Sequence, residues 1–115
     1  MLSLEQLQLI EAKTGIVFTD KDLLRQVFIH RSYLNENPGC KIAHNERLEF
    51  LGDAVLELAV TEFLYSHFPN PEGELTNWRS ALVRGQHLAQ VCSELELGTW
   101  LLVSRGESKA GGKSR

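Results

Sequence analysis

The sequence is poor in the features that mark secreted proteins, membrane proteins and zinc scaffolds. It contains only two cysteines, Cys40 and Cys92, which lie far apart with no C-x-x-C spacing, and this predicts neither a disulfide framework nor a zinc site. No apolar run approaches the roughly 18 residues that a membrane-spanning helix needs. The start of the chain lacks a basic leader, an unbroken apolar stretch and a small-residue cleavage site, so no secretion signal is indicated. We therefore expect a reduced, cytoplasmic protein that does not associate with membranes.

The sequence also lacks alternating apolar and polar runs of more than a few residues, which are typical of half-buried strands. Apolar residues recur instead at helical intervals almost throughout. Hydrophobic residues make up 43% and charged residues 23% of the 115 positions, ordinary values that exclude a disordered polymer, a collagen and a mucin-like stalk. The length allows one domain and no internal repeat is evident. We expect a single all-α domain spanning residues 1–115.

Positive charge is scarce in the body of the chain. The last twelve residues hold four basic residues and one acidic residue, which leaves eight basic and fourteen acidic residues in the preceding part, a net charge of −6. An acidic body argues against a simple electrostatic nucleic-acid binder. It does not exclude an enzyme that reaches a polyanion through bound metal cations.

Helical segments are predicted from apolar spacing and from residues that start or stop helices. The first begins near Leu4 and stops at Gly15, and the second is capped by Thr19 or Asp20 and carries apolar residues up to Phe28. The remaining predictions are a loop at residues 35–39, helices at residues 46–66, 73–84 and 86–97, a break at residues 67–72 and a stop at Gly98.

The longest predicted helix, residues 46–66, carries most of the information. Asn45 is placed to cap it. Its apolar residues predict a core stripe made of Leu48, Leu51, Val55, Leu58 and Leu64. The tail at residues 104–115 has no large apolar residue and three glycines, so we expect it to be a loop.

A stripe of acids runs along the same helix. Glu46, Glu49 and Asp53 fall within an arc of roughly 60°, and Glu49 and Asp53 lie about 6 Å apart along the axis, so both carboxylates can reach one ion. None of these three residues, nor Glu57, has a lysine or arginine three or four positions away. Stacked like charges at this spacing each cost a few tenths of a kcal/mol. Such a stripe needs either bulk water or a cation.

Two interpretations of the stripe stay open at this point. A solvated acidic face is common, and the helix dipole accounts for Glu46 and partly for Glu49. Asp53, however, lies two turns in, and Gly52 costs about 1 kcal/mol relative to alanine in mid-helix, which suggests the close approach of another backbone. If a cation is bound, oxygen-only ligands favour Mg²⁺ or Mn²⁺ over zinc, and Mg²⁺ with one or two carboxylates suggests phosphodiester chemistry.

The run NERLEFLGDAVL at residues 45–56 resembles the signature of ribonuclease III, the endonuclease of double-stranded RNA. Further matches occur in the family's order, at HRSY (residues 30–33), EGELT (72–76), RSALV (79–83) and GG (111–112). The resemblance covers nearly the whole chain. A continuous signature with several flanking motifs is far more specific than an isolated acidic triplet.

The resemblance implies an all-helical endonuclease domain that works as a homodimer on double-stranded RNA, including precursors of rRNA and mRNA. Family members use Mg²⁺, with Mn²⁺ as a substitute, to hydrolyse a phosphodiester, and they leave 5′-phosphate and 3′-hydroxyl ends. The roles that it assigns are metal ligand for Glu49, catalytic carboxylate and metal ligand for Asp53, supporting acids for Glu46 and Glu72, and the dimer interface for Phe50 with Gly52.

The sequence departs from the family pattern after residue 115. The family's domain continues into a helix with a second aspartate and glutamate that complete the metal site, and a double-stranded RNA-binding domain is common. Neither is present here, so we expect weak Mg²⁺ binding and little or no activity from this chain alone. The basic tail is expected to lie nearer the RNA than the core.

Two other functional hypotheses are compatible with the sequence. One is a non-catalytic member of the same fold that binds or scaffolds RNA, and the other is an unrelated helical interaction module with an acidic face. Retention of both Glu49 and Asp53 favours the enzyme, because a scaffold has no need of a charge-strained helix.

We expect the histidines and tryptophans to have structural roles. The four histidines share no metal-ligand spacing. His30 and Ser32 are expected to satisfy local hydrogen bonds where the second helix ends, and Trp78 and Trp100 are expected to pack in the core.

Overall fold

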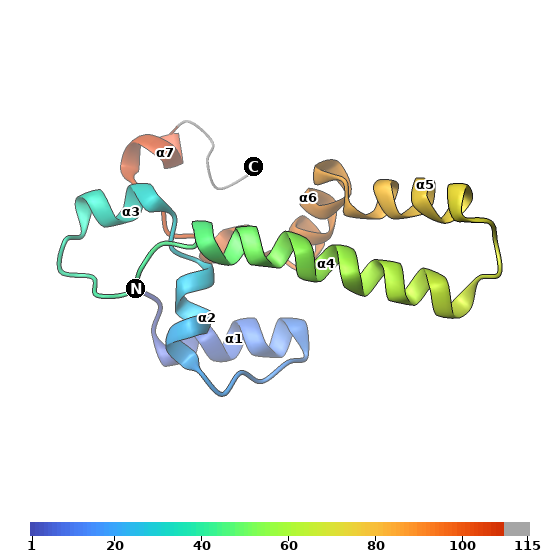
Figure 1. Cartoon of the computed structure of the whole chain (residues 1–115). Helices are drawn as coiled ribbons and strands as arrows, with labels where there is room; N and C mark the ends of the chain where they lie inside the picture. Colours follow the sequence, from blue (N-terminus) through green and yellow to red (C-terminus); the bar gives the residue numbers. More distant parts are fainter. Residues whose placement is uncertain (110–115) are drawn as a thin grey trace.

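The computed structural model describes residues 1–109, and this part of the chain is helical with no strand (Figure 1). A single bridge pairs Ile29 with Leu102 in parallel. The all-α prediction is confirmed. The helices are α1 (Leu4–Thr14), α2 (Lys21–Val27), α3 (Arg31–Glu36), α4 (Glu46–His67), α5 (Glu72–Val83), α6 (Gly85–Glu94), the 3₁₀ helix η1 (Leu97–Trp100) and α7 (Arg105–Lys109).

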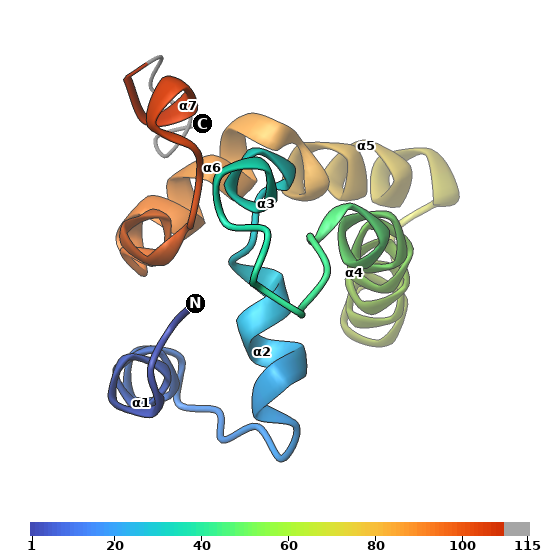
Figure 2. The same ribbon diagram turned by 90° about the vertical axis from the view of Figure 1, so that its left-hand side faces the viewer.

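The molecule is elongated, with extents of 52 × 32 × 24 Å. Helix α4 leaves the body formed by residues 1–44, and α5 turns back along the distal half of α4 (Figure 1). Helix α6 and η1 then bring the chain back to that body, and α2 lies between α1 and α4 in the view of Figure 2. Residues 46–94 therefore form an arm that starts and ends at the α1–α3 body. None of the helices within residues 1–109 has both the length and the apolar character needed to cross a membrane.

The ends of the first two helices follow from local rules. Ser3 and Gln6 form a capping box at the start of α1, and Gly15 ends it with a φ of 74°, a conformation that favours glycine. At α2 the Asp20 carboxylate accepts from the Leu23 amide at 3.0 Å, so Asp20 and not Thr19 is the cap. Both predicted boundaries are confirmed.

The hydrophobic core lies under α1 and α2. Its buried members are Leu2, Leu7, Ile10, Leu24 and Phe28, and partly buried Phe18, Leu97, Trp100 and Leu102 pack against them. The C-terminal segment thus closes the body that the N-terminal helices begin, which confirms the packing role predicted for Trp100. The arm contributes no residue to this cluster.

The core stripe predicted for α4 is wrong along most of its length, although the bounds of the helix are close to the prediction. Only Leu64 is buried, at 4% exposure, whereas Leu51 and Val55 are each 58% exposed and Leu58 is 70% exposed. The reason is that α5 covers one side of the distal half of α4, and no other described helix covers the opposite side. An amphipathic pattern identifies an apolar side but not the element that covers it.

Three short helices were not predicted: α3, η1 and α7. The stop predicted at Gly98 is wrong, because α6 ends at Glu94 and Gly98 lies inside η1. Helix α3 begins after its N-cap His30, whose ring nitrogen accepts from the Ser32 amide. The loop predicted for residues 104–115 is wrong at Arg105–Lys109, because the Ser104 hydroxyl accepts from the Glu107 amide at 3.1 Å and starts a helical turn. Residues 110–115, and with them the GG match, lie outside the described residues.

A buried carboxylate fixes the connection between α1 and α2. Glu11 is 8% exposed, and one of its oxygens accepts from Lys21 Nζ and from the Phe18 amide, each at 2.7 Å. The Lys21 hydrogen bond and then the Phe18 amide lower the pKa of Glu11. The ionised carboxylate therefore ties the loop between the helices to α1.

We expect Glu11→Gln to lower the melting temperature at neutral pH, because the neutral amide loses the charge-assisted bond to Lys21. Since the folded-state pKa is lowered, the contribution of Glu11 is present above its unfolded pKa and is lost as the pH falls through the folded value. The difference in melting temperature between Glu11→Gln and the parent should therefore shrink as the pH falls. Thermal melts across pH 3–7, with exposed Glu5→Gln as control, measure it; a constant difference across that range would contradict the assignment.

Candidate active site on helix α4

The predicted site residues Glu46, Glu49 and Asp53 lie on the first two turns of α4, and all three are exposed. The helix begins directly after Asn45, whose carbonyl accepts from the Glu49 amide at 2.9 Å. Glu49 and Asp53 are four residues apart, about 40° around the axis and about 6 Å along it. Regular helical geometry therefore places the two carboxylates on the same side.

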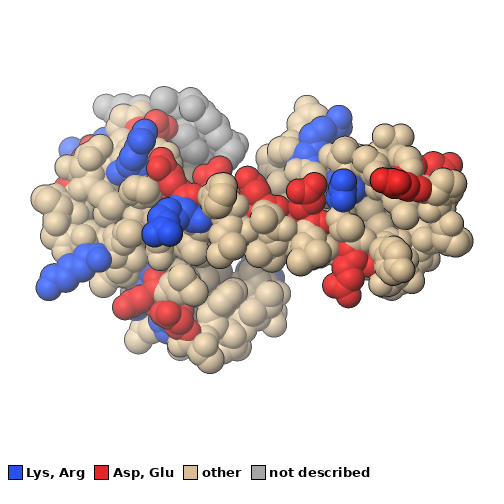
Figure 3. Space-filling view, in the orientation of Figure 1, with Lys and Arg blue, Asp and Glu red and all other residues tan. Residues whose placement is uncertain are grey.

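The fold neutralises the two ends of the acidic stripe. Arg31 of α3 lies 3.6 Å from Glu46, and Arg79 of α5 lies 3.7 Å from Glu57. Figure 3 shows acidic groups following one another along α4, with basic groups near both ends. The sequence interpretation of four uncompensated acids is thus wrong for Glu46 and Glu57, because their partners come from other helices.

The middle of the stripe, formed by Glu49 and Asp53, is not neutralised by an ion pair within residues 1–109. Neither Glu49 nor Asp53 forms an ion pair with any residue in the described part of the chain. Within residues 1–109, two like charges are thus held one turn apart without a basic partner. These are the two residues for which a metal role was predicted.

The donor set suits a hard cation. Carboxylate oxygens are what Mg²⁺ and Mn²⁺ prefer, and Mg²⁺ is commonly held through one or two carboxylates while it keeps several waters. Within residues 1–109 no group of three or more His, Cys, Asp or Glu side chains is placed to hold a metal ion. Glu49 and Asp53 therefore fit as one side of a magnesium site and not as a complete shell.

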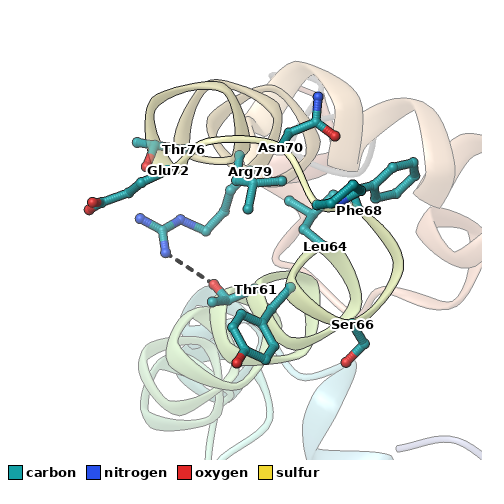
Figure 4. A pocket seen from close by; sticks show the side chains of 11 residues that line it. Thr61, Leu64, Ser66, Phe68, Asn70, Glu72, Thr76 and Arg79 are labelled. Carbon is teal, nitrogen blue, oxygen red and sulfur yellow. Dashed lines mark hydrogen bonds between the residues drawn. The ribbon is translucent and has the colours of Figure 1, made fainter.

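Glu72 does not join these carboxylates. It is the first residue of α5 and lines a pocket of about 780 Å³ between the distal end of α4 and the start of α5. In Figure 4 its carboxylate points outward from the pocket. Thr61, which lies across this pocket, is eight residues beyond Asp53, about 12 Å along α4. Within one chain, Glu72 is thus separated from the Glu49 and Asp53 pair.

Arg79 is a structural residue of the site that the sequence did not single out. Its side chain crosses from α5 to α4, where Nη1 donates to the Thr61 hydroxyl at 3.1 Å (Figure 4). That hydroxyl in turn donates to the Glu57 carbonyl at 2.7 Å. Arg79 thus fixes α5 against α4 beside the acidic stripe. Spacing along the helix gives no signal for it, because the partners are 18 and 22 residues away.

Phe50 and Gly52 face different sides of α4. Two residues two positions apart are separated by about 200° around a helix. Phe50 is 82% exposed but lies about 80–140° around the axis from the exposed apolar residues Leu51, Val55 and Leu58. At Gly52 an added Cβ would meet no atom within 4 Å. The described residues therefore supply no close neighbour for Gly52, and a single flat contact cannot include both residues.

The expected pairing of His30 and Ser32 is confirmed. His30 Nδ1 accepts from the Ser32 amide at 3.1 Å and lies 2.7 Å from its hydroxyl. The same hydroxyl accepts from the Ser104 amide at 2.8 Å. These groups join α3 to the C-terminal segment and serve the fold.

Comparison with known proteins supports the resemblance. A family profile described as Ribonuclease-III-like matches residues 20–115. Ribonuclease 3 of Enterococcus faecalis is 49% identical over 107 residues, which are 92% of this chain and 46% of that protein. Ribonuclease 3 of Streptococcus thermophilus is 46% identical over 109 residues, 94% of this chain and 48% of that protein. The chain spans about half the length of the curated relatives that it matches.

Solved structures give the same result for the fold. A nuclease domain of ribonuclease III from Campylobacter jejuni, described as flexible in a region involved in dimer formation, superposes with a TM-score of 0.83 at 39% identity. The match covers 95% of this chain and 73% of that one. A second structure of that nuclease domain gives a TM-score of 0.82 and covers 100% of this chain and 73% of its own. The helical arrangement is thus that of a ribonuclease III nuclease domain.

We expect Asp53→Asn to raise the free energy of unfolding in metal-free, low-salt buffer by about 0.2–0.5 kcal/mol, because it removes the repulsion with Glu49. The gain should shrink at high salt, which screens exposed charges. Urea unfolding at two ionic strengths measures it. Glu62→Gln is the matched control, since exposed Glu62 lies on the opposite side of α4 with no acid one turn away. A loss of stability, or a gain equal to that of the control, would contradict the repulsion.

Proposed function

Because the chain belongs to the ribonuclease III family, we propose that it forms part of a metal-dependent endoribonuclease domain that cleaves double-stranded RNA. The observation that carries this proposal is the contrast within one helix. In the described part of the chain, Glu46 and Glu57 have arginine partners, whereas Glu49 and Asp53 have none. Because arginines pair with the two outer acids and not with Glu49 and Asp53, the two central carboxylates are suited to hold a cation.

Glu49 and Asp53 would hold Mg²⁺, with Mn²⁺ as a substitute. When bound, the ion supplies Lewis acidity toward a phosphate oxygen and lowers the pKa of a coordinated water. The carboxylates contribute the negative charge that fixes the ion, and Arg31 lies beside the neighbouring Glu46. The cation also lets an acidic body approach the RNA phosphates, since the chain carries a net charge of −3.

The proposed substrate class and products are those that the family resemblance implies. Hydrolysis of a phosphodiester by such a centre leaves 5′-phosphate and 3′-hydroxyl ends in this family. A-form RNA duplexes are recognised through shape, phosphates and 2′-hydroxyls, so little sequence readout is expected. RNA processing, including that of rRNA and mRNA precursors, and a cytoplasmic location stay predictions from the resemblance and the composition.

A homodimer is the assembly that we propose. Leu51, Val55 and Leu58 lie within an arc of about 60° on α4 and are exposed, the exposed Phe50 flanks them, and large exposed apolar patches mark interaction sites. A solved relative is described as having a region involved in dimer formation. Pairing two copies of this side would bury the apolar residues and present two carboxylate pairs to one duplex.

Residues 1–115 alone should show little or no cleavage, since the described part holds only two of the ligands of the proposed site. We therefore expect activity in a chimera in which this chain replaces the matching half of Enterococcus faecalis Ribonuclease 3. Asp53→Asn in the chimera should reduce Mg²⁺-dependent cleavage of an RNA duplex by about 10²-fold or more, because the metal contributes several kcal/mol to the transition state. Gel-based single-turnover rates measure this, with Glu62→Gln as the control.

One result would contradict the expectation of an incomplete site, and another would contradict the catalytic function. Efficient cleavage by residues 1–115 alone, abolished by Asp53→Asn, would contradict the incomplete site. A chimera that binds the duplex with parental affinity but does not cleave it would favour the non-catalytic RNA-binding alternative.

The dimer has its own test. We expect Phe50→Glu to shift the chain toward its 13.0 kDa monomer in sedimentation at high protein concentration, because a charge replaces an apolar contact at the interface. Val17→Glu is the control, since Val17 is 79% exposed and far from α4 in sequence. Equal association of the parent and both variants would contradict an interface on this side of α4.

A further inference from the structure

The start of α4 is held by three hydrogen bonds to the end of α2. The Asn45 amide donates to the Ile29 carbonyl at 2.9 Å, and Asn45 Nδ2 donates to the Val27 carbonyl at 2.7 Å. Gln26 Nε2 donates to the His44 carbonyl at 3.1 Å. The last carbonyls of a helix have no partner within the helix, so Asn45 satisfies groups that the end of α2 leaves open.

Asn45 stands at the N-cap position but does not act as a cap. A capping side chain accepts, through its oxygen, from an amide two or three residues on, and no such bond forms here. The side chain is used through its nitrogen, as a donor. The sequence prediction that Asn45 caps this helix is therefore right about the position and wrong about the bond.

The segment that receives Asn45 is itself fixed. Phe28 and Ile29 are buried, at 6% and 0% exposure. On its other edge, Leu102 donates to the Phe28 carbonyl at 2.7 Å and accepts from the His30 amide at 3.0 Å. Residues 27–30 thus anchor the start of the arm through Asn45 and also bind Leu102, in the segment that follows the arm.

The carboxylates of the site depend on this anchor because the first half of α4 has few other ties. Its ion pair with the body, between Arg31 and Glu46, joins two side chains that are 69% and 52% exposed, and exposed pairs contribute little. Asp53 lies eight residues beyond Asn45, about 12 Å along the axis, so a tilt of roughly 10° at Asn45 displaces it by about 2 Å.

We propose that Asn45 is a positioning residue, whose side-chain N–H bond to Val27 sets the direction in which α4 leaves the α1–α3 body. Through that direction it places Glu49 and Asp53 relative to the rest of the site, a consequence that rests on the proposed function. The mutual geometry of Glu49 and Asp53 does not depend on it, since both belong to one helix.

Asn45→Asp separates this role from capping. Aspartate is as good a cap as asparagine and favours the helix dipole, so a capping role predicts unchanged or higher stability. The positioning role predicts lower stability, because a carboxylate oxygen would face the Val27 carbonyl where the Asn45 side chain now donates. Asn77→Asp, at an exposed position of α5, is the control with the same change in charge.

The direct measurement is the orientation of α4 from residual dipolar couplings of the metal-free chain. One alignment tensor should fit α1, α2 and α4 in the parent and in Asn77→Asp. In Asn45→Asp we expect the α4 couplings to depart from that tensor, together with a lower melting temperature. If this variant does not fold, Asn45→Ser removes the amide donor without adding charge and should give the same departure.

In the Enterococcus faecalis chimera, Asn45→Asp should lower the cleavage rate by about 10²-fold, the effect expected of a misplacement of about 1 Å. A variant in which α4 keeps its direction overturns the inference, whether or not the chimera is active. A reoriented α4 with undiminished cleavage also overturns it. Failure of the parent chimera to cleave would overturn the proposed function alone, because the couplings are measured without metal or substrate.

Discussion

The repulsion between two carboxylates one turn apart on α4 is the constraint on which the site depends. Glu49 and Asp53 stand about 6 Å apart along the axis, and no ion pair within residues 1–109 relieves them. The fold does neutralise such groups where it brings a base to them, since Arg31 reaches Glu46 and Arg79 reaches Glu57. A divalent cation would turn the remaining repulsion into attraction, and this is the physical basis of the metal-dependent site that we propose.

The architecture holds this pair away from the hydrophobic core. The core lies under α1 and α2, and the arm of residues 46–94 contributes nothing to it. The chain is instead attached to residues 27–30 just before the arm, through Asn45, and again after the arm, through Leu102. Within the arm, Arg79 links α5 to α4. A few hydrogen bonds thus position the site, whereas hydrophobic packing stabilises the body. The opposite side of α4 stays apolar and exposed.

Features governed by neighbouring residues could be predicted from the sequence, whereas features governed by distant partners could not. Gly15 and Asp20 mark helix ends because caps act over a few residues, and the spacing of Glu49 and Asp53 follows from the helical repeat alone. The burial of Leu51 and Val55 was predicted wrongly, since it depends on how far α5 extends. The partners of Glu46 and the use of the Asn45 side chain as a donor likewise come from other helices.

Paramagnetic broadening by Mn²⁺ tests the central claim most directly. Substoichiometric Mn²⁺ added to the isotopically labelled chain should first broaden the amide resonances of residues 49–53, and Glu49→Gln should abolish that preference. The amides around Glu5 and Glu62, which are exposed acids outside the pair, should stay sharp until much more Mn²⁺ is present. Equal broadening around all exposed acids would mean that Glu49 and Asp53 form an ordinary solvated face, and the account of a metal-dependent site would fail.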